Sequence, residues 1–203
     1  MPPEKELLLI FTRNPELGKV KKRLAADIGD ASALKLYRFL LKHTCEVVKE
    51  LQMDKCVYYS EKIPQQDLWD ETLFEKQLQQ GAELGERMEK AFKKAFSEGY
   101  SKVVIIGSDL YDLQEEDLKK AFLALEQSEY VLGPASDGGY YLFGMKSLNS
   151  RVFRNKTWGT ATVLQETLRD LQNEKTTMLE VRNDIDYLED LEAYPELQQI
   201  IRT

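Results

Sequence analysis

The sequence is short of the residues that build metal clusters and disulfide frameworks. It has one histidine, His43, and two cysteines, Cys45 and Cys56, in 203 residues. A single histidine cannot form a histidine metal cluster, and His43 is expected to pack on or near a helix surface. The cysteines lack CxxC spacing, so we expect both to be buried free thiols in a reducing cytosol. The expected location is therefore cytoplasmic.

Positive net charge and long apolar runs are also missing. The net charge of −7 argues against non-specific binding to nucleic acid or anionic membranes, because both need a positive field. No stretch approaches the roughly 18 apolar residues of a membrane span. Residues 1–10 lack the basic start and small-residue cleavage site of a signal peptide. We therefore expect no nucleic-acid partner and no membrane span, and the oligomeric state stays open.

Short apolar runs alternate with helical patterns along the chain, whose length suits one domain over 1–203. The expected strands are Glu6–Phe11, Lys55–Tyr59, Val103–Ile106, Glu129–Gly133, an aromatic strand from Tyr140, and Met178–Val181. The expected helices are Ala31–Leu51, one ending at Phe96, Glu115–Gln127, one ending near Leu171, and Tyr187–Ile200. A loop with a partial helix near Ile63-Pro64 is expected over Glu61–Phe74. This alternation predicts a three-layer α/β/α fold with a mostly parallel sheet.

The stretch Val103–Leu113 is the most informative. Its four leading apolar residues run directly into Gly107, Ser108 and Asp109. An apolar run without polar alternation predicts a strand buried on both faces, and open α/β sheets bind ligands just past the carboxyl ends of such strands. A turn role is the alternative for Asp109, but Asp112 has the spacing to cap the following helix. Asp109 is therefore the first functional candidate.

The loop after the first expected strand is basic in an otherwise acidic chain. Asn14-Pro15 and Gly18 are turn signals. The region has five cations in eleven positions, Arg13, Lys19, Lys21, Lys22 and Arg23. A basic, glycine-containing loop between a strand and a helix can hold phosphates. The spacing matches neither a P-loop nor GxGxxG, and a solvated charge run is the alternative of equal weight.

A second acid lies in a turn ahead of an aromatic strand. Asp137 precedes Gly138-Gly139 and the strand that begins at Tyr140. Paired glycines let the backbone approach a ligand closely or adopt a positive φ. A simple hairpin turn gives the same pattern, so both interpretations stand at this point.

The last third of the chain adds an aromatic residue and two more acids. Trp158-Gly159-Thr160 precedes a helix, with Thr160 as its expected N-cap. After the last expected strand, Asp184 and Asp186 are spaced so that both could reach one metal ion. They could equally cap the final helix.

Taken together, these segments resemble the GT-A-type nucleotide-diphospho-sugar transferases. Within them the likeness is closest to a small bacterial family of transferases associated with radical-SAM and selenoprotein genes, some of which are linked to arsenosugar biosynthesis. The stretches that carry the resemblance are LLIFTRNPELGKVKKRL (8–24), QGAELGERMEKAF (80–92), VVIIGSDLYDL (103–113), LGPASDGGYYLFG (132–144), WGTATVL (158–164) and NDIDYLEDL (183–191). They follow the family's order and span nearly the whole chain.

The resemblance implies a donor nucleotide sugar held over the carboxyl ends of the first strands. The residues that it assigns to the nucleotide and its phosphates are Phe11, Thr12, Arg13, Gly18, Lys21, Lys22, Arg23 and Ser108. Those that it assigns to the substrate side are Gly138, Gly139, Tyr140 and Trp158. Asp109 would hold Mg²⁺ or Mn²⁺, with Asp184 or Asp186 as a further ligand. Asp137 is the candidate general base, and with Asp109 it makes up the expected catalytic pair.

The chain departs from the family pattern in the strand-end motif and in the basic loop. Leu110 and Tyr111 replace a small residue and a proline, so no Asp-Xaa-Asp follows the strand. Arg13 stands where a lysine is usual, and Lys22 where a threonine is usual. Arg13 keeps the positive charge but changes the donor geometry.

Three functions follow from these observations. The leading hypothesis is metal-dependent transfer of a sugar from a nucleotide sugar to a small acceptor hydroxyl. The second is nucleotidyl transfer, as in related guanylyltransferases that act on phosphorylated small molecules and share the loop layout. The third is a non-catalytic nucleotide-binding or scaffold relative, motivated by the altered Leu110-Tyr111 pair, because a fold does not fix a function. The products separate the first two, since glycosyl transfer releases a nucleoside diphosphate and nucleotidyl transfer releases pyrophosphate.

Overall fold

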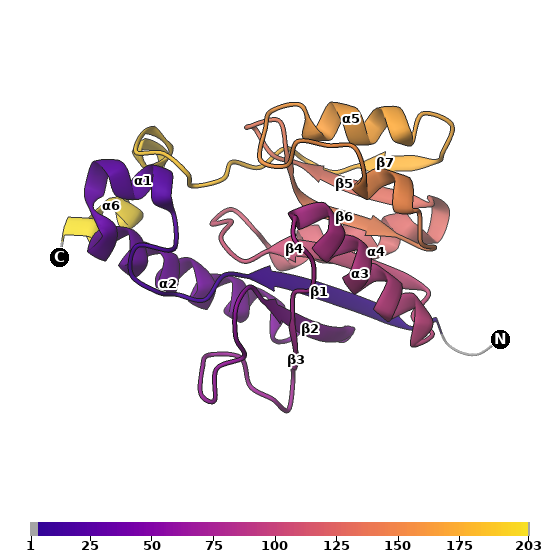
Figure 1. Cartoon of the computed structure of the whole chain (residues 1–203), viewed down its shortest axis with the longest axis horizontal. Helices are drawn as coiled ribbons and strands as arrows, with labels where there is room; N and C mark the ends of the chain where they lie inside the picture. Colours follow the sequence, from indigo (N-terminus) through magenta and orange to yellow (C-terminus); the bar gives the residue numbers. More distant parts are fainter. Residues whose placement is uncertain (1–3, 203) are drawn as a thin grey trace.

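One seven-stranded sheet forms the middle of the protein, of which a computed structural model describes residues 4–202 (Figure 1). The ends of the expected 1–203 domain, residues 1–3 and 203, lie outside the described part. The strands follow the order β3-β2-β1-β4-β6-β5-β7 across the sheet. Their bounds are β1 Glu6–Thr12, β2 Asp54–Tyr59, β3 Glu75–Leu78, β4 Lys102–Gly107, β5 Tyr130–Pro134, β6 Tyr140–Met145 and β7 Thr176–Met178. Only β6 runs antiparallel to its neighbours in this described sheet, which confirms the predicted α/β fold.

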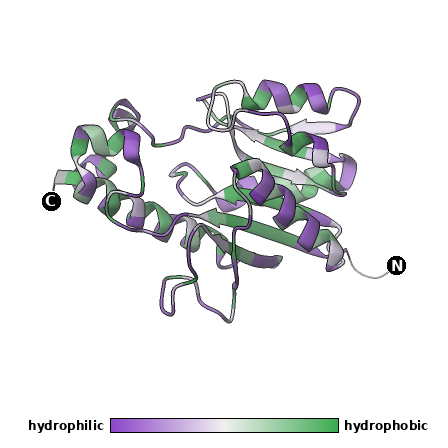
Figure 2. Ribbon diagram, in the orientation of Figure 1, coloured by the Kyte–Doolittle hydropathy of each residue, from purple (hydrophilic) through white to green (hydrophobic). Residues whose placement is uncertain are grey.

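Helices cover both faces of the sheet and complete three layers. Alternate residues of β1 separate the two faces: Leu8 and Ile10 pack in one core with α2 and α4, whereas Leu7 and Leu9 pack in another with α3. The hydropathy colouring shows the apolar strands between helices whose outer faces are polar (Figure 2). The helices are α1 Lys22–Ile28, α2 Asp30–Val48, α3 Leu84–Ser97, α4 Glu115–Gln127, α5 Val163–Asp170 and α6 Pro195–Arg202, with 3-10 turns η1 Ser150–Phe153 and η2 Glu189–Ala193.

A smaller apolar cluster joins the helices that follow β1 to the C-terminal segment. Leu24 of α1, Leu36 and Leu40 of α2, and Leu197 of α6 are all fully buried in it. The C-terminal segment therefore lies beside the loop that follows β1 (Figure 1). This placement brings residues 184–186 to the carboxyl edge of the sheet.

Several local expectations are wrong at element ends. The strand β3 went unpredicted because it is a four-residue polar edge strand with no apolar alternation. The expected partial helix near Ile63-Pro64 is absent from the described chain, which forms turns there. The last strand ends at Met178 instead of beginning there. The final helix starts only at Pro195, because a 3-10 turn and a proline interrupt the expected longer helix.

The expected helix caps also differ. Gln114 caps α4 in a box with Asp117, so Asp112 is free to accept a hydrogen bond from Tyr194 Oη at 2.6 Å. Thr162, not Thr160, is the N-cap residue of α5.

The predictions for cysteine and histidine are confirmed. Cys45 and Cys56 are buried free thiols, and burial raises the pKa of each to about 11 and about 12 respectively. His43 packs on the Tyr111 ring with centroids 5.1 Å apart. Within residues 4–202, no helix combines the length and apolarity needed to cross a bilayer.

Candidate functional site

Two adjoining hollows open at the carboxyl edge of the sheet. We call the one beside the loop after β1 the basic hollow and the one beside the β5–β6 hairpin the aromatic hollow. Their volumes are about 570 Å³ and about 220 Å³. Phe11, Leu84 and Gly107 line both, so together the hollows form one cleft. Open α/β sheets bind ligands at this edge.

The floor of the basic hollow is a buried hydroxyl network. Thr12 Oγ1 accepts a hydrogen bond from Ser108 Oγ at 3.0 Å, and Tyr37 Oη lies 3.3 Å from Thr12 Oγ1. Arg13 donates its backbone N–H to Tyr37 Oη at 2.9 Å. Thr12 and Ser108 are almost fully buried. Thr12 and Ser108, which were both predicted to bind the nucleotide, therefore support the loop through buried hydroxyl groups. The Arg13 side chain is exposed.

Asp109 lines the basic hollow, two residues beyond Gly107, which lines both hollows, and forms an ion pair with Lys21. The Nζ atom of Lys21 lies 2.7 Å from Asp109 Oδ2 and 3.0 Å from Asp186 Oδ1. The Lys21 side chain is 4% exposed, whereas those of Asp109 and Asp186 are 42% and 37% exposed. Arg23 Nη1 lies 3.3 Å from the other oxygen of Asp186. Segments 165 residues apart in sequence thus meet at one ammonium group.

These contacts fix the charge states. Burial alone would raise the pKa of Asp109, but the charge and hydrogen bond of Lys21, helped by Arg13, bring that pKa below its usual value. Burial likewise opposes ionisation of Lys21, but Asp109 and Asp186 raise its pKa above the usual value. Both groups are therefore charged at neutral pH.

Lys21 also adopts an unusual backbone conformation. It precedes α1 with φ 45° and ψ 48°, in the left-handed region, and non-glycine residues there are uncommon. Such strain persists only where surrounding contacts fix it, and it clusters at functional sites. The two ion pairs of the buried ammonium supply such contacts.

The other members of the basic loop are less central. Lys19 lines the basic hollow and pairs with Glu16 and Glu61, each at 2.8 Å. Lys22 is exposed at the start of α1, and Gly18, at φ 72°, provides a turn before it. Neither Lys22 nor Gly18 lines either hollow.

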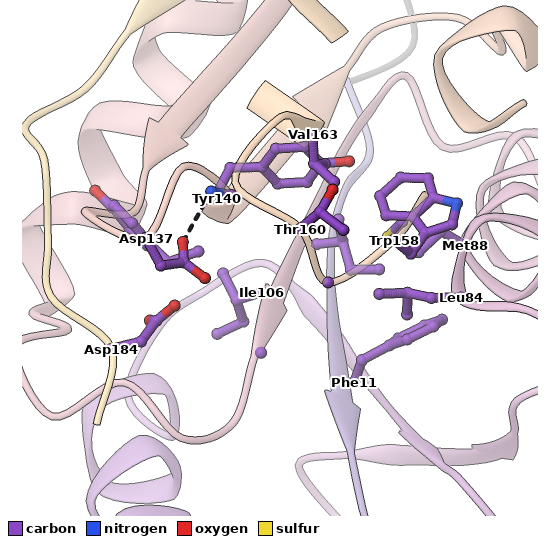
Figure 3. Close-up of a pocket in the computed structure, with 15 residues that line it drawn as sticks. Phe11, Leu84, Met88, Ile106, Asp137, Tyr140, Trp158, Thr160, Val163 and Asp184 are labelled. Atoms are coloured by element: carbon purple, nitrogen blue, oxygen red, sulfur yellow. Dashed lines mark hydrogen bonds between the residues drawn. The ribbon is translucent and has the colours of Figure 1, made fainter. Parts of the chain in front are cut away.

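The aromatic hollow has an acidic end and an aromatic end. Asp137 and Asp184 lie together at one end, with Trp158, Leu84 and Phe11 at the other (Figure 3). Tyr140 packs edge-on against Trp158 with ring centroids 6.4 Å apart.

Asp137 serves the hairpin turn and also faces the hollow. Its Oδ1 accepts a hydrogen bond from the backbone N–H of Gly139 at 2.8 Å. Gly138 has φ 89°, and a Cβ there would lie 2.2 Å from the Ala161 carbonyl oxygen. The paired glycines thus satisfy turn geometry and close packing. The turn and ligand interpretations of Asp137 are therefore compatible.

The pKa of Asp184 is shifted in the opposite direction to that of Asp109. Burial and then the negative charge of Asp109 raise its pKa to about 7, with smaller contributions from Asp137 and Asp186 and an opposing one from Lys21. The carboxylates of Asp109 and Asp137 thus act on Asp184 within the cleft, and positive charge brought there is stabilised.

Among residues 4–202, no three histidine, cysteine, aspartate or glutamate side chains converge as a metal centre. Mg²⁺ does not need such a centre, because it is usually held by one or two carboxylates together with substrate phosphates and water. Asp109 and Asp184 offer the hard oxygen donors that this mode requires. Asp186 instead has both oxygens engaged by Lys21 and Arg23.

Sequence reasoning missed the polar residues that β3 and the start of α3 bring to the basic hollow. Gln79 donates to the backbone oxygens of Thr12 and Tyr58 at 3.1 and 2.9 Å. Arg87 donates to the Gly81 oxygen at 2.9 Å and to Gln79 Oε1 at 3.3 Å. The sequence signal is the turn at 80–85 and the helix start after it, where Glu86 and Arg87 allow a ligand-facing role as well as a surface ion pair.

The fold and this cleft define an α/β protein of the nucleotide-sugar transferase type. Residues 43–160 match a family model described as "Uncharacterized protein conserved in bacteria (DUF2064)", and the chain belongs to this family. A candidate nucleotide-diphospho-sugar transferase from Desulfovibrio desulfuricans G20 is 32% identical, with a TM-score of 0.87 over 98% of this chain and 94% of that one. The resemblance to the nucleotide-diphospho-sugar transferases is thereby confirmed.

Two more distant structures share the fold alone. The 4-diphosphocytidyl-2C-methyl-D-erythritol synthase from Anaerococcus prevotii DSM 20548 is 12% identical, with a TM-score of 0.61 over 97% of this chain and 96% of that one. A cytidylyltransferase from Leptospira borgpetersenii serovar Hardjo-bovis is 15% identical, with a TM-score of 0.56 over 98% and 93% of the two chains. No curated protein sequence matches the chain.

Proposed function

We propose that this protein transfers a sugar from a nucleotide-diphosphate sugar to a small acceptor hydroxyl. The observation that carries the proposal is the division of one cleft into a basic hollow, lined by Asp109, and an aromatic hollow that shares Gly107 with it. The reaction needs such a division, because the donor's diphosphate is anionic whereas a hydroxyl acceptor presents apolar faces and uncharged hydroxyl groups. The 32% identical structure, a candidate nucleotide-diphospho-sugar transferase, supports the same class.

The basic hollow would hold the nucleotide. Arg13 and Arg87 bring guanidinium groups to it, and such groups bind phosphates through paired N–H donors. Phe11 offers a ring face, and its own ring lies 5.3 Å from that of Tyr58. Lys21 would stabilise the negative charge that builds on the departing diphosphate.

Asp109 and Asp184 would hold a divalent cation, Mg²⁺ or Mn²⁺. When bound, such an ion neutralises charge on the leaving diphosphate. The protein's own part is to keep Asp109 ionised through Lys21 and to bring Asp184 to the same edge of the sheet.

Asp137 would accept the proton of the attacking hydroxyl. One of its oxygens is held by the Gly139 N–H, which fixes the carboxylate and leaves the second oxygen for the acceptor. A general base must lie within hydrogen-bond reach of the proton that it removes, and Asp137 lines the aromatic hollow.

Nucleotidyl transfer is the second candidate, because two structures with this fold are a cytidylyltransferase and a 4-diphosphocytidyl-2C-methyl-D-erythritol synthase. The products decide between the two reactions. Nucleoside diphosphate released from a nucleotide sugar supports glycosyl transfer. Pyrophosphate released from a nucleoside triphosphate supports nucleotidyl transfer.

The test begins with a thermal-shift panel of nucleotide sugars and nucleoside di- and triphosphates, with and without Mn²⁺, followed by turnover of the donor that binds. A ligand that binds only the folded protein raises its melting temperature. Asp109→Asn should lower donor turnover by about a hundredfold or more. Asp112→Asn is the matched control, because Asp112 pairs with Tyr194 instead of lining either hollow. Full activity in Asp109→Asn contradicts the proposal.

A further inference from the structure

The two hollows of the cleft carry opposite charge. Arg13, Lys19 and Arg87 line the basic hollow. In the described chain, no lysine, arginine or histidine lines the aromatic hollow, whose charged side chains are Asp137 and Asp184. An anion entering the aromatic hollow would therefore meet carboxylates and no cation lining its wall.

Arg23, which contacts the lining residue Gly159 at the rim of the aromatic hollow, already has partners. Arg23 Nη2 donates to the Gly159 oxygen at 3.5 Å, and its Nη1 pairs with Asp186 at 3.3 Å. The guanidinium also lies over the Tyr187 ring, 5.5 Å from the centroid. Arg23 thus has partners of its own and does not line the hollow.

The remaining wall is apolar and rigid. Trp158 packs so closely on α3 that a Cβ at Gly85 would lie 2.4 Å from its Nε1 and 2.3 Å from the Phe153 oxygen. Leu84 and Met88 of α3 complete this side. Rings held in this way offer flat apolar surface without a large cost in side-chain entropy.

We propose that the acceptor bound in the aromatic hollow is an uncharged hydroxyl compound with a flat apolar face, and that phosphorylated acceptors are excluded. This inference rests on the proposed function, which assigns the donor to the basic hollow. The acceptor's ring packs on Trp158, and its hydroxyl lies at the Asp137 end. The carboxylate of Asp137, joined by that of Asp184 when it is ionised, repels an acceptor phosphate, since like charges are strongly unfavourable where water is partly excluded.

The transfer step balances with these groups alone. The acceptor oxygen forms a bond to the anomeric carbon while the bond from that carbon to the diphosphate oxygen breaks. The electron pair of the broken bond stays on the diphosphate, which leaves as a nucleoside diphosphate. The acceptor proton passes to Asp137, so the products are a neutral glycoside, the nucleoside diphosphate and a protonated carboxyl group.

The same charge pattern disfavours the nucleotidyl alternative. The hypothesised guanylyltransferase-like reaction joins a nucleotide to a phosphorylated small molecule, so its acceptor is an anion. The aromatic hollow, which adjoins the donor site, has no cation in its described lining with which to bind one. Whether the hollow binds a neutral or an anionic acceptor therefore distinguishes glycosyl transfer from nucleotidyl transfer.

The test compares phenyl β-glucoside with phenyl β-glucoside 6-phosphate, which differ only in the phosphate. Binding is followed by Trp158 fluorescence in a Trp69→Phe background, since Trp69 is the only other tryptophan and lies buried against Phe74. Calorimetric titration of the wild-type chain repeats the measurement without a substitution. Both are run with EDTA, so that no divalent cation adds positive charge to the cleft.

We expect phenyl β-glucoside to bind at least about tenfold more tightly than phenyl β-glucoside 6-phosphate. Asp137→Asn should reduce this difference in affinity between the two compounds. Equal or tighter binding of the phosphate overturns the inference, as does failure of both compounds to bind at about 10 mM. Donor turnover is scored separately by diphosphate release. If the protein prefers the neutral compound but turns over no donor, the inferred charge selectivity stands and the proposed sugar transfer is refuted.

Discussion

Replacing Lys21 with methionine tests how the cleft is held together. Methionine keeps most of the aliphatic stem and removes the ammonium that contacts Asp109 at 2.7 Å and Asp186 at 3.0 Å. It also keeps a side chain in the left-handed backbone conformation, so the backbone strain is nearly the same in both proteins. The substitution therefore isolates the two ion pairs.

The expected loss follows from the burial of the three groups. Removing one partner of a fully buried ion pair costs about 3–5 kcal/mol, because a charge is left buried and unpaired. Here the two carboxylates stay 42% and 37% exposed, and water can solvate them once the ammonium is gone. Ion pairs at the surface contribute about 0–1 kcal/mol to stability. We therefore expect Lys21→Met to lower the free energy of unfolding by an intermediate amount, about 2 kcal/mol. For a chain of this size that lowers the melting temperature by about 4–8 °C.

The loss should depend on pH in a defined direction. The pKa of Asp109 is lowered in the folded protein, so its stabilising contribution is present above the unfolded pKa of about 3.9 and is lost as the pH falls through the folded value. The pKa of Lys21 is raised, so its contribution persists up to the unfolded pKa of about 10.4 and declines only above it. The effect of Lys21→Met should therefore be constant from about pH 5 to 10 and shrink below about pH 4.

Urea and thermal unfolding at pH 7 and in a series from about pH 4 down to about pH 2.5 measure these differences. Lys22→Met is the matched control, because Lys22 is the exposed neighbour of Lys21 and surface changes usually stay within about 0.5 kcal/mol. A Lys21→Met protein as stable as the wild type at pH 7 would refute the reasoning. Equal losses in the two variants would refute it as well.

Two further substitutions test other parts of the cleft. The pKa of Asp184 is raised to about 7 in the folded protein, so its negative charge destabilises the fold increasingly from about pH 4 to 7. In EDTA at pH 8, Asp184→Asn should therefore raise the free energy of unfolding by about 1–2 kcal/mol. Parallel urea titrations at pH 5 should show that most of this gain is lost. The ring of Tyr111 packs on Phe39, His43 and Tyr194. Tyr111→Ala should lower the free energy of unfolding by about 2–3 kcal/mol without weakening nucleotide binding in the thermal-shift panel. Tyr111→Phe keeps the ring and should restore the stability.

The parts of the fold that depend on local pattern were predictable. β1 and β4 are uninterrupted apolar runs because both of their faces are covered, and α4 has the predicted bounds Glu115–Gln127. The strand β3 was not predictable, since its pairing with β2 is determined by tertiary contact and not by its own polar sequence.

The unusual Leu110-Tyr111 pair shows where sequence comparison alone is ambiguous. In the sequence, these residues departed from the family pattern beside Asp109 and so motivated the hypothesis of a non-catalytic relative. In the structure, Leu110 is buried in the core. Tyr111 contacts α2 and the C-terminal segment, where its hydroxyl donates to Glu196 Oε1 at 3.0 Å. The pair therefore has a packing explanation, and that motivation is removed.

The pairing of Lys21 with Asp186 marks the limit of prediction from this sequence. Spacing could relate Asp184 to Asp186, and it could relate Lys21 to Arg23, but nothing local connects residues 165 positions apart. Their meeting requires the parallel pairing of β7 on β5 and the packing of α6 against α2. Because Asp186 then pairs with both Lys21 and Arg23, part of the basic loop is already paired within the chain. An anionic donor must compete with Asp186 for Lys21, so removing that carboxylate by Asp186→Asn should tighten nucleotide binding at the cost of stability.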